Sequence, residues 1–283
     1  MKRRAAAALV LSMTVFLGAC GQNKSDTATA EKAVEEAEEA AEEAIETIEE
    51  NASEAEAAVE EAVIDVSDEA RVMSYQEYID ADLDTPVAVE TYVQDKQSWW
   101  ENQATLYTQN EDGAFFIYNA GVSEDDYALL VPGTKIKVTG FKSEWSGEVE
   151  IVDGTIEIED GSFLAEPVDV TALLGSDSLI DHQNELVTFK GLTIVAAGQD
   201  ENGNDVPFFY NWDNSGSRGD DVYFKAALDG NEYTFTIESY LRDDSTDVYQ
   251  AAEALSIGDT VDLTGFLYWY EGANPHITDI QKV

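Results

Sequence analysis

Cysteine and histidine are scarce in this chain, and their scarcity limits the chemistry that it can carry. The 283 residues include one cysteine, Cys20, and two histidines, His182 and His276. One thiol cannot form a disulfide within the chain, so the folded domains must be held together by their hydrophobic cores. Neither histidine lies in a recognisable catalytic motif, and no Gly-x-Ser-x-Gly sequence accompanies them. We therefore predict that the protein is not an enzyme.

Positive charge is also scarce. The chain has 15 Lys and Arg against 59 Asp and Glu, a formal net charge of −44. Beyond residue 70 the balance is 10 Lys and Arg against 41 Asp and Glu, which leaves −31 on that part of the chain. Affinity for nucleic acid comes largely from Lys and Arg side chains that neutralise phosphates. On charge, we do not expect nucleic acid as a partner.

The N-terminus combines a basic segment, an apolar run and the single cysteine. Residues 2–4 are Lys-Arg-Arg, residues 5–16 are mostly apolar, and Leu17-Gly18-Ala19-Cys20 follows. The apolar run is too short to span a bilayer, and the order is that of a secretory signal. Leu-Gly-Ala-Cys resembles the lipobox of bacterial lipoproteins. The resemblance implies cleavage after residue 19, a diacylglycerol on the Cys20 thiol, and a lipid anchor that holds the protein at the extracytoplasmic face of the cell membrane. The alternative is an ordinary secreted protein.

An acidic segment follows the cysteine and extends to about residue 70. From Ala30 to Val63 it consists almost wholly of alanine and glutamate, without glycine or proline. This composition favours a helix, and small apolar residues recur at spacings of three and four. We predict an exposed helical stalk in residues 20–70 that acts as a spacer. A coiled coil and a partly disordered segment are the alternatives, because closely spaced glutamates repel one another.

Beyond residue 70 the chain contains an internal repeat. Gly133, Gly140 and Phe141 recur 125 positions later as Gly258, Gly265 and Phe266, within similar β-branched runs. A duplicated domain explains the repeat better than chance does. We place the first domain at 71–161 and the second at 162–283.

Short β-branched and aromatic runs, separated by Gly, Asn and Asp, predict two all-β domains. In the first copy we expect strands near 87–95, 103–109, 114–119, 134–143 and 147–158, with a helix near 123–130. In the second copy we expect strands near 186–197, 206–212, 221–229, 232–239, 259–269 and 275–282, with a helix at 246–255. Three strands, a helix and two strands is the order of the OB-fold, a five-stranded barrel. A plain β-sandwich is the alternative.

The phrase Gly-x-x-(Ile/Val)-x-(Val/Leu)-Thr-Gly-Phe after a short helix resembles the fourth strand of OB-like domains in bacterial surface lipoproteins and in accessory domains of secreted nucleases. The resemblance covers roughly residues 72–283. It implies two tandem OB-fold-like barrels, but it does not identify an activity, because OB barrels bind many kinds of ligand.

Aromatic side chains near loop ends are the candidate ligand-binding residues. Flat rings beside polar loops can stack on sugar rings or anchor a partner protein. Packing in the two cores is the competing interpretation for each ring, and strand alternation places at least one ring of the triplet 268–270 on the buried side. The candidates are Trp99, Trp100, Trp145, Trp212, Tyr268, Trp269 and Tyr270.

Two loops rich in oxygen ligands, 200–205 and 213–221, raise the question of a cofactor. Ca²⁺ needs six to eight oxygen ligands, but neither loop has EF-hand spacing, and ordinary turn chemistry explains the same residues. We expect no cofactor and no metal site, with Ca²⁺ as a minor alternative. Arg218-Gly219-Asp220 also matches an integrin-type tripeptide, a match that arises easily by chance.

These observations predict a non-catalytic binding or assembly module, anchored to a membrane through Cys20, with a saccharide or a surface protein as its ligand. A single-stranded nucleic-acid-binding OB protein and an accessory component of a secreted hydrolase are the alternatives.

Overall fold

The computed structural model describes residues 71–283, which belong to one compact unit. The predicted signal peptide, Cys20 and the acidic stalk lie outside the described residues. Within 71–283, no helix has both the length and the apolar character that a membrane span requires.

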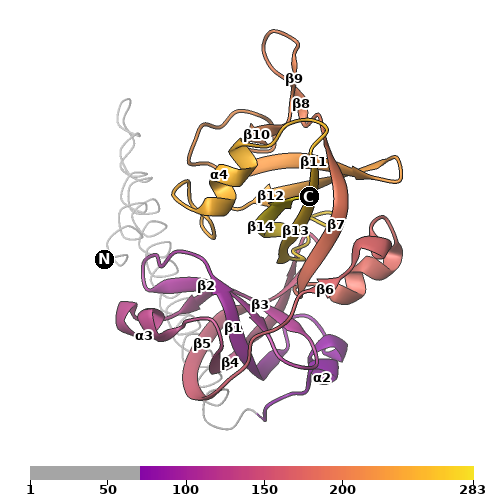
Figure 1. Cartoon of the computed structure of the whole chain (residues 1–283). Coiled ribbons are helices and arrows are strands. Elements are labelled where there is room, and N and C mark those ends of the chain that lie inside the picture. Colours follow the sequence, from indigo (N-terminus) through magenta and orange to yellow (C-terminus); the bar gives the residue numbers. More distant parts are fainter. Residues whose placement is uncertain (1–70) are drawn as a thin grey trace, which may run out of the picture. The chain divides into compact units, whose positions relative to one another are not determined.

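The first half of this unit is a closed five-stranded barrel (Figure 1). The strands follow the order β1-β2-β3-β5-β4, and only the β3–β5 pairing is parallel. A helix, α3 (Glu124–Leu129), connects β3 to β4. This is the topology of an OB-fold. The strands are β1 (Pro86–Lys96), β2 (Gln103–Gln109), β3 (Ala114–Gly121), β4 (Thr134–Trp145) and β5 (Glu148–Ser162).

The second half repeats this barrel. Strands β11, β12, β14, β13 and β7 are neighbours in that order, and the pairing of β11 with β7 closes the ring. Again one pairing, β12 with β14, is parallel, and α4 (Asp247–Glu253) precedes β13. The prediction of two OB-fold-like barrels is therefore confirmed. The strands are β7 (Leu186–Val195), β11 (Val222–Leu228), β12 (Asn231–Ile237), β13 (Thr260–Phe266) and β14 (His276–Lys282).

The second barrel carries additions that the sequence pattern indicated only in part. The strand expected near 206–212 is the three-residue edge strand β10 (Phe208–Tyr210), preceded by a small hairpin of β8 (Gly198–Gln199) and β9 (Asp205–Val206). Between the barrels, β6 (Val168–Asp169) pairs with β7, and two 3-10 turns follow, Thr171–Leu173 and Asp177–His182. Such short elements are too brief to show a period in the sequence.

A short helix before the first barrel was not expected from the sequence. Helix α2 (Tyr75–Asp80) begins at Ser74, whose hydroxyl accepts from the Glu77 amide while the Glu77 carboxylate accepts from the Ser74 amide. This reciprocal capping satisfies two backbone donors that the first turn would otherwise leave unpaired. It also places Tyr78 against the core of the first barrel, where its ring packs 5.0 Å from that of Phe115.

The repeat read from the sequence has a structural cause in the last hairpin of each barrel. Gly140 on β4 faces β5, where a Cβ would lie 2.6 Å from the Val152 carbonyl oxygen. Gly265 on β13 faces β14, where a Cβ would lie 2.1 Å from the His276 carbonyl oxygen and 2.7 Å from the Ile277 Cα. Both glycines sit at an irregularity in the strand pairing, so the backbones approach too closely for a side chain.

Replacing Gly265 with alanine is expected to lower the free energy of unfolding by about 3 kcal/mol, because the methyl group collides with backbone atoms that cannot rotate away. Urea denaturation measures the change. Gly121→Ala is the control, since the nearest atom to its added Cβ is 3.8 Å away. Equal stability of the two variants would contradict the account of the repeat.

The barrels have separate cores and share a third apolar cluster. Tyr107 and Phe116 from the first barrel meet Leu241 and Phe266 from the second, and all four are buried. The Tyr107 and Phe266 rings stack with their centroids 4.6 Å apart. Aromatic contacts of this kind join the two barrels.

A buried glutamate reinforces the contact between the two barrels, which we call the joint. Glu148, at the start of β5, is completely buried, and its Oε2 atom accepts from the Trp269 amide at 2.8 Å and from Gln183 Nε2 at 3.1 Å. Nearby, the Glu271 amide donates to the Ser146 carbonyl at 2.7 Å. Ser146 and Glu271 are 125 positions apart, so the equivalent hairpin loops of the two barrels touch each other.

Candidate ligand-binding groove

A groove of about 1460 Å³ lies between the two barrels, and both contribute to it. In an OB-fold, ligands bind on the face of strands two and three and on the loops that follow strands one and four. The first barrel lines the groove with residues of β2 and β3, of the loop after β1, and with Trp145 at the end of β4. The second barrel lines it with residues of β11 and β12, of the segment after β7, and of the loop after β13. The faces on which other OB-folds bind ligands therefore form opposite walls of one groove in this chain.

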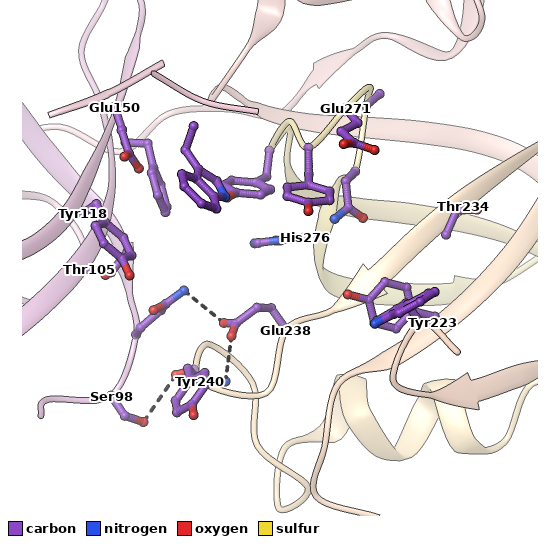
Figure 2. A pocket seen from close by; sticks show the side chains of 18 of the residues that line it. Ser98, Thr105, Tyr118, Glu150, Tyr223, Thr234, Glu238, Tyr240, Glu271 and His276 are labelled. Atoms are coloured by element: carbon purple, nitrogen blue, oxygen red, sulfur yellow. Dashed lines mark hydrogen bonds between the residues drawn. The ribbon is translucent and has the colours of Figure 1, made fainter. Parts of the chain in front are cut away.

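Figure 2 shows this arrangement from close by. Tyr118 and Glu150 lie on one side, Tyr223 and Thr234 lie on the opposite side, and His276 lies between them. Tyr118 belongs to β3 of the first barrel, and Tyr223 to β11 of the second. A ligand in the groove would thus touch side chains separated by more than a hundred residues in the sequence.

Three tryptophans give the groove its most unusual feature. Trp100, Trp145 and Trp212 line it, and their exposed fractions are 71%, 61% and 76%. Large apolar side chains gathered at one hollow mark an interaction site more often than chance exposure does. Since Trp100 and Trp145 belong to the first barrel and Trp212 to the second, flat rings are available from both walls.

The other predicted aromatic residues divide between the groove and the interior. Tyr268 and Tyr270 line the groove, whereas Trp269 packs against the core of the second barrel. Trp99 is also outside the groove, because it packs against the first core and donates its indole N–H to the Val122 carbonyl at 3.1 Å. Five of the seven candidates therefore come together, and Trp99 and Trp269 have packing roles.

The floor of the groove is a buried polar and aromatic cluster. The His276 ring stacks on Tyr268 with 4.3 Å between centroids, and its Nδ1 atom lies 2.6 Å from the Tyr107 hydroxyl. Burial lowers the pKa of His276 to about 3, so the imidazole is neutral at physiological pH. The neutral His276 ring is held by stacking on Tyr268 and by its hydrogen bond with Tyr107, and these contacts fix the shape of the groove floor.

Two carboxyl groups face the groove with pKa values close to neutrality. Burial raises the pKa of Glu150 to about 7, and the burial of Glu238, reinforced by the charge of Asp221, raises its pKa to about 7 as well. Glu238 is held by the Leu241 amide at 2.8 Å and by Gln97 Nε2 at 3.1 Å. Within residues 71–283, the Glu150 side chain has neither a hydrogen-bond nor an ion-pair partner, in contrast to Glu238. Its carboxyl group is therefore available to a ligand.

The loops considered for Ca²⁺ are organised by turn hydrogen bonds. Asp200 Oδ1 accepts from the Asn202 and Asn204 amides, each at 2.8 Å. Asp213 Oδ1 accepts from the Ser215 amide at 3.0 Å. No group of three or more His, Cys, Asp or Glu side chains in the described part of the chain is arranged to hold a metal ion.

The Arg218-Gly219-Asp220 tripeptide is tied into the second barrel. The Arg218 guanidinium pairs with Asp244 at 2.5 Å and with Glu253 at 3.0 Å. The Asp220 carboxylate accepts from the Ser217 amide at 2.9 Å. These contacts give the tripeptide a structural role.

Comparison with known proteins finds similar solved structures, of which three are described here. No protein-family model and no curated protein matches the sequence. A murine DNA-binding protein bound to double-stranded DNA matches 69% of this chain over 96% of its own length, with 10% identity and a TM-score of 0.33. A Replication Protein A heterotrimer bound to single-stranded DNA matches 75% of this chain over 51% of its own length, with 11% identity and a TM-score of 0.32. The Ifi202 HINa domain in complex with double-stranded DNA matches 71% of this chain, with 11% identity and a TM-score of 0.30.

These matches contradict the expectation that nucleic acid is excluded as a partner, since each of the three proteins is described as bound to DNA. The TM-scores are too low to carry an argument about what this chain itself binds. The expectation rested on the net charge of the chain and of its part beyond residue 70, and net charge does not report on aromatic rings that stack on bases. Nucleic acid therefore stays among the ligand classes to be tested.

Several lining residues were not anticipated from the sequence. Tyr118, Tyr223 and Tyr240 line the groove together with Glu150 and Glu238. The tyrosines on strands resemble ordinary core residues in the alternating pattern, and the glutamates cannot be told apart from the abundant surface acids. The available signal was the repeat itself, because duplicated OB barrels bring two ligand-binding faces into one chain.

Proposed function

We propose that this chain is a non-catalytic binding protein that holds a ligand whose rings stack on aromatic side chains in the groove between its two OB-fold-like barrels. One observation supports the proposal above the others: three highly exposed tryptophans, from both barrels, line one groove on the OB ligand-binding faces. Exposed tryptophans supply large contact area with few rotatable bonds, which is the character of binding hot spots.

A saccharide is the ligand class that fits the polar lining best. Gln97, Asn119 and Asn274 supply amide groups beside the aromatic rings, and Glu150 and Glu238 supply carboxyl groups. A sugar ring presents an apolar face for stacking and hydroxyl groups that pair with such amides and carboxyls.

Single-stranded nucleic acid is the second candidate. The observation that favours it is the position of the aromatic rings on strands two and three of OB barrels, where bases can stack. Stacking contributes about 1–3 kcal/mol per base and does not depend on base identity.

The sequence adds a location to this proposal. A diacylglycerol on Cys20 would anchor the protein at the extracytoplasmic face of a membrane, and the acidic segment of residues 20–70 would hold the groove away from it. The Leu17-Gly18-Ala19-Cys20 motif supports this part of the proposal.

Alanine in place of Trp145 or Trp212 is expected to weaken binding of the ligand about tenfold in each case, because each substitution removes a stacking surface from one wall. Isothermal titration of the full chain with cellohexaose, with the hexamer of N-acetylglucosamine and with single-stranded oligodeoxythymidine measures the effect. Leu129→Ala is the matched control, since Leu129 is 59% exposed and does not line the groove.

Equal affinities of Trp145→Ala, Trp212→Ala and Leu129→Ala for a ligand that does bind would contradict the proposal. Conversion of a bound probe to a product during the titration would contradict its non-catalytic part. Failure of every probe to bind, together with the capture of one specific surface protein through the groove, would replace the ring-stacking ligand with a protein partner.

A further inference from the structure

The charge of the groove narrows the ligand class. Three carboxyl groups line it, those of Glu150, Glu238 and Glu271, against one lysine, Lys225. Glu150 is 7% exposed and Glu271 lies at the open loop after β13. Acidic side chains are abundant on this protein, so their presence is informative only where other features coincide with them.

The Glu150 carboxyl group differs from the abundant surface acids of this protein. It is nearly buried, it faces the groove, and no side chain or amide of residues 71–283 pairs with it. Burial alone accounts for the raised pKa of this group. An ionised carboxylate that is largely withdrawn from water and has no protein partner is costly, and the cost falls when a cation or a donor pairs with it. The partner of Glu150 is therefore expected to arrive with the ligand.

Aromatic residues lie on the strands beside Glu150 and in the same groove. Glu150 on β5 is the pairing partner of Phe116 on β3, and the Phe116 ring packs 5.2 Å from that of Tyr268. Tyr118 and Trp145 also line the groove. Faces of Tyr and Trp rings attract organic cations, and the attraction grows when water is excluded.

We propose that the ligand is a saccharide that carries free amino groups, so that its sugar rings stack on the tryptophans and its ammonium groups pair with Glu150 and Glu271. This inference rests on the proposed function and adds the charge of the ligand to it. One ligand then uses the three features of the lining at once: exposed flat rings, amide groups for hydroxyls, and an unpaired carboxyl group.

A matched pair of probes isolates the charge. The hexamer of glucosamine and the hexamer of N-acetylglucosamine share a ring skeleton, and only the first carries ammonium groups. In isothermal titration of the full chain in about 0.15 M salt, which screens remote charges, the glucosamine hexamer is expected to bind at least about tenfold more tightly. Glu150→Gln should reduce this preference to about twofold or less. Glu166→Gln, an exposed acid that does not line the groove, should leave it unchanged.

The outcomes separate this inference from the function on which it rests. Equal binding of the two hexamers, with loss of both in Trp145→Ala, would overturn the cationic ligand and leave ring stacking intact. Binding of oligodeoxythymidine in preference to both hexamers would overturn the saccharide. Binding of oligolysine as tight as that of the glucosamine hexamer would show that charge alone is recognised, which also overturns it. No binding by any probe would defeat the proposed function as well.

Discussion

Replacing Glu148 with glutamine is expected to raise the free energy of unfolding at pH 9 by roughly 3–5 kcal/mol, while changing it little at pH 5. Glu148 is fully buried in the joint between the barrels, and burial raises its pKa to about 8 from an ordinary value of 4.5. Ionisation would place an uncompensated charge at the joint, which is costly. Glutamine keeps the oxygen that accepts from the Trp269 amide and never ionises.

The direction of the pH effect follows from proton binding. Between pH 4.5 and pH 8 the folded protein keeps a proton on Glu148 that the unfolded chain has lost, so the free energy of unfolding falls as pH rises through this window. Glu150 and Glu238, whose pKa values are raised to about 7, act in the same direction. Above the folded pKa values the loss is complete. The wild-type protein should therefore be most stable on the acidic side of neutrality.

Burial outweighs hydrogen bonding at Glu148. The Trp269 amide and the Asn184 and Gln183 side chains lower its pKa, but the larger effect of burial raises it. Within residues 71–283, the Glu148 Oε1 atom is buried without a hydrogen-bond partner. Glutamine has nearly the same shape as protonated glutamic acid, and its amide N–H can donate as the protonated carboxyl does, so the substitution is expected to leave the joint intact.

Urea denaturation at pH 5, 7 and 9 tests this prediction, with Glu166→Gln as the control because Glu166 is exposed. The wild-type protein and the control should lose stability together as pH rises, and Glu148→Gln should lose less. Parallel curves for all three proteins would contradict the assignment of a neutral, buried Glu148 to the joint.

Replacing Cys20 with serine is expected to abolish lipid-dependent association of the protein with membranes. A serine hydroxyl is not the thiol that receives the diacylglycerol, so the variant should appear in the soluble fraction or keep its signal segment uncut. Detergent phase partitioning and mass spectrometry of the N-terminus measure the two outcomes. Ala19→Gly, which keeps a small residue before Cys20, is a control that should remain anchored. Unchanged, lipid-dependent fractionation of Cys20→Ser would defeat the proposed anchor.

Much of the fold could be predicted from the sequence because its signals are local. Alternating β-branched residues marked the strands of both barrels, and Gly140 and Gly265 marked the repeat through a backbone contact that tolerates no side chain. Helix α2 was not predicted because its six residues are too few to show a helical period.

The groove could be predicted only in part because its walls meet through long-range contacts. Alternation separated Tyr268 and Tyr270 from Trp269 correctly, but nothing local distinguished Trp99, which packs inward, from Trp100, which faces the groove. Tyr107 meets His276 across 169 positions, and Glu148 meets Trp269 across 121. The sequence around each of these residues does not reveal that the faces of the two barrels share one groove.

The stoichiometry of binding tests the central claim most directly. If the two OB faces form a single site, isothermal titration of the full chain with the tightest hexamer should give one ligand per chain, and either Trp145→Ala or Trp212→Ala should weaken that one event. Two independent ligands per chain, each sensitive to only one of these substitutions, would contradict the account.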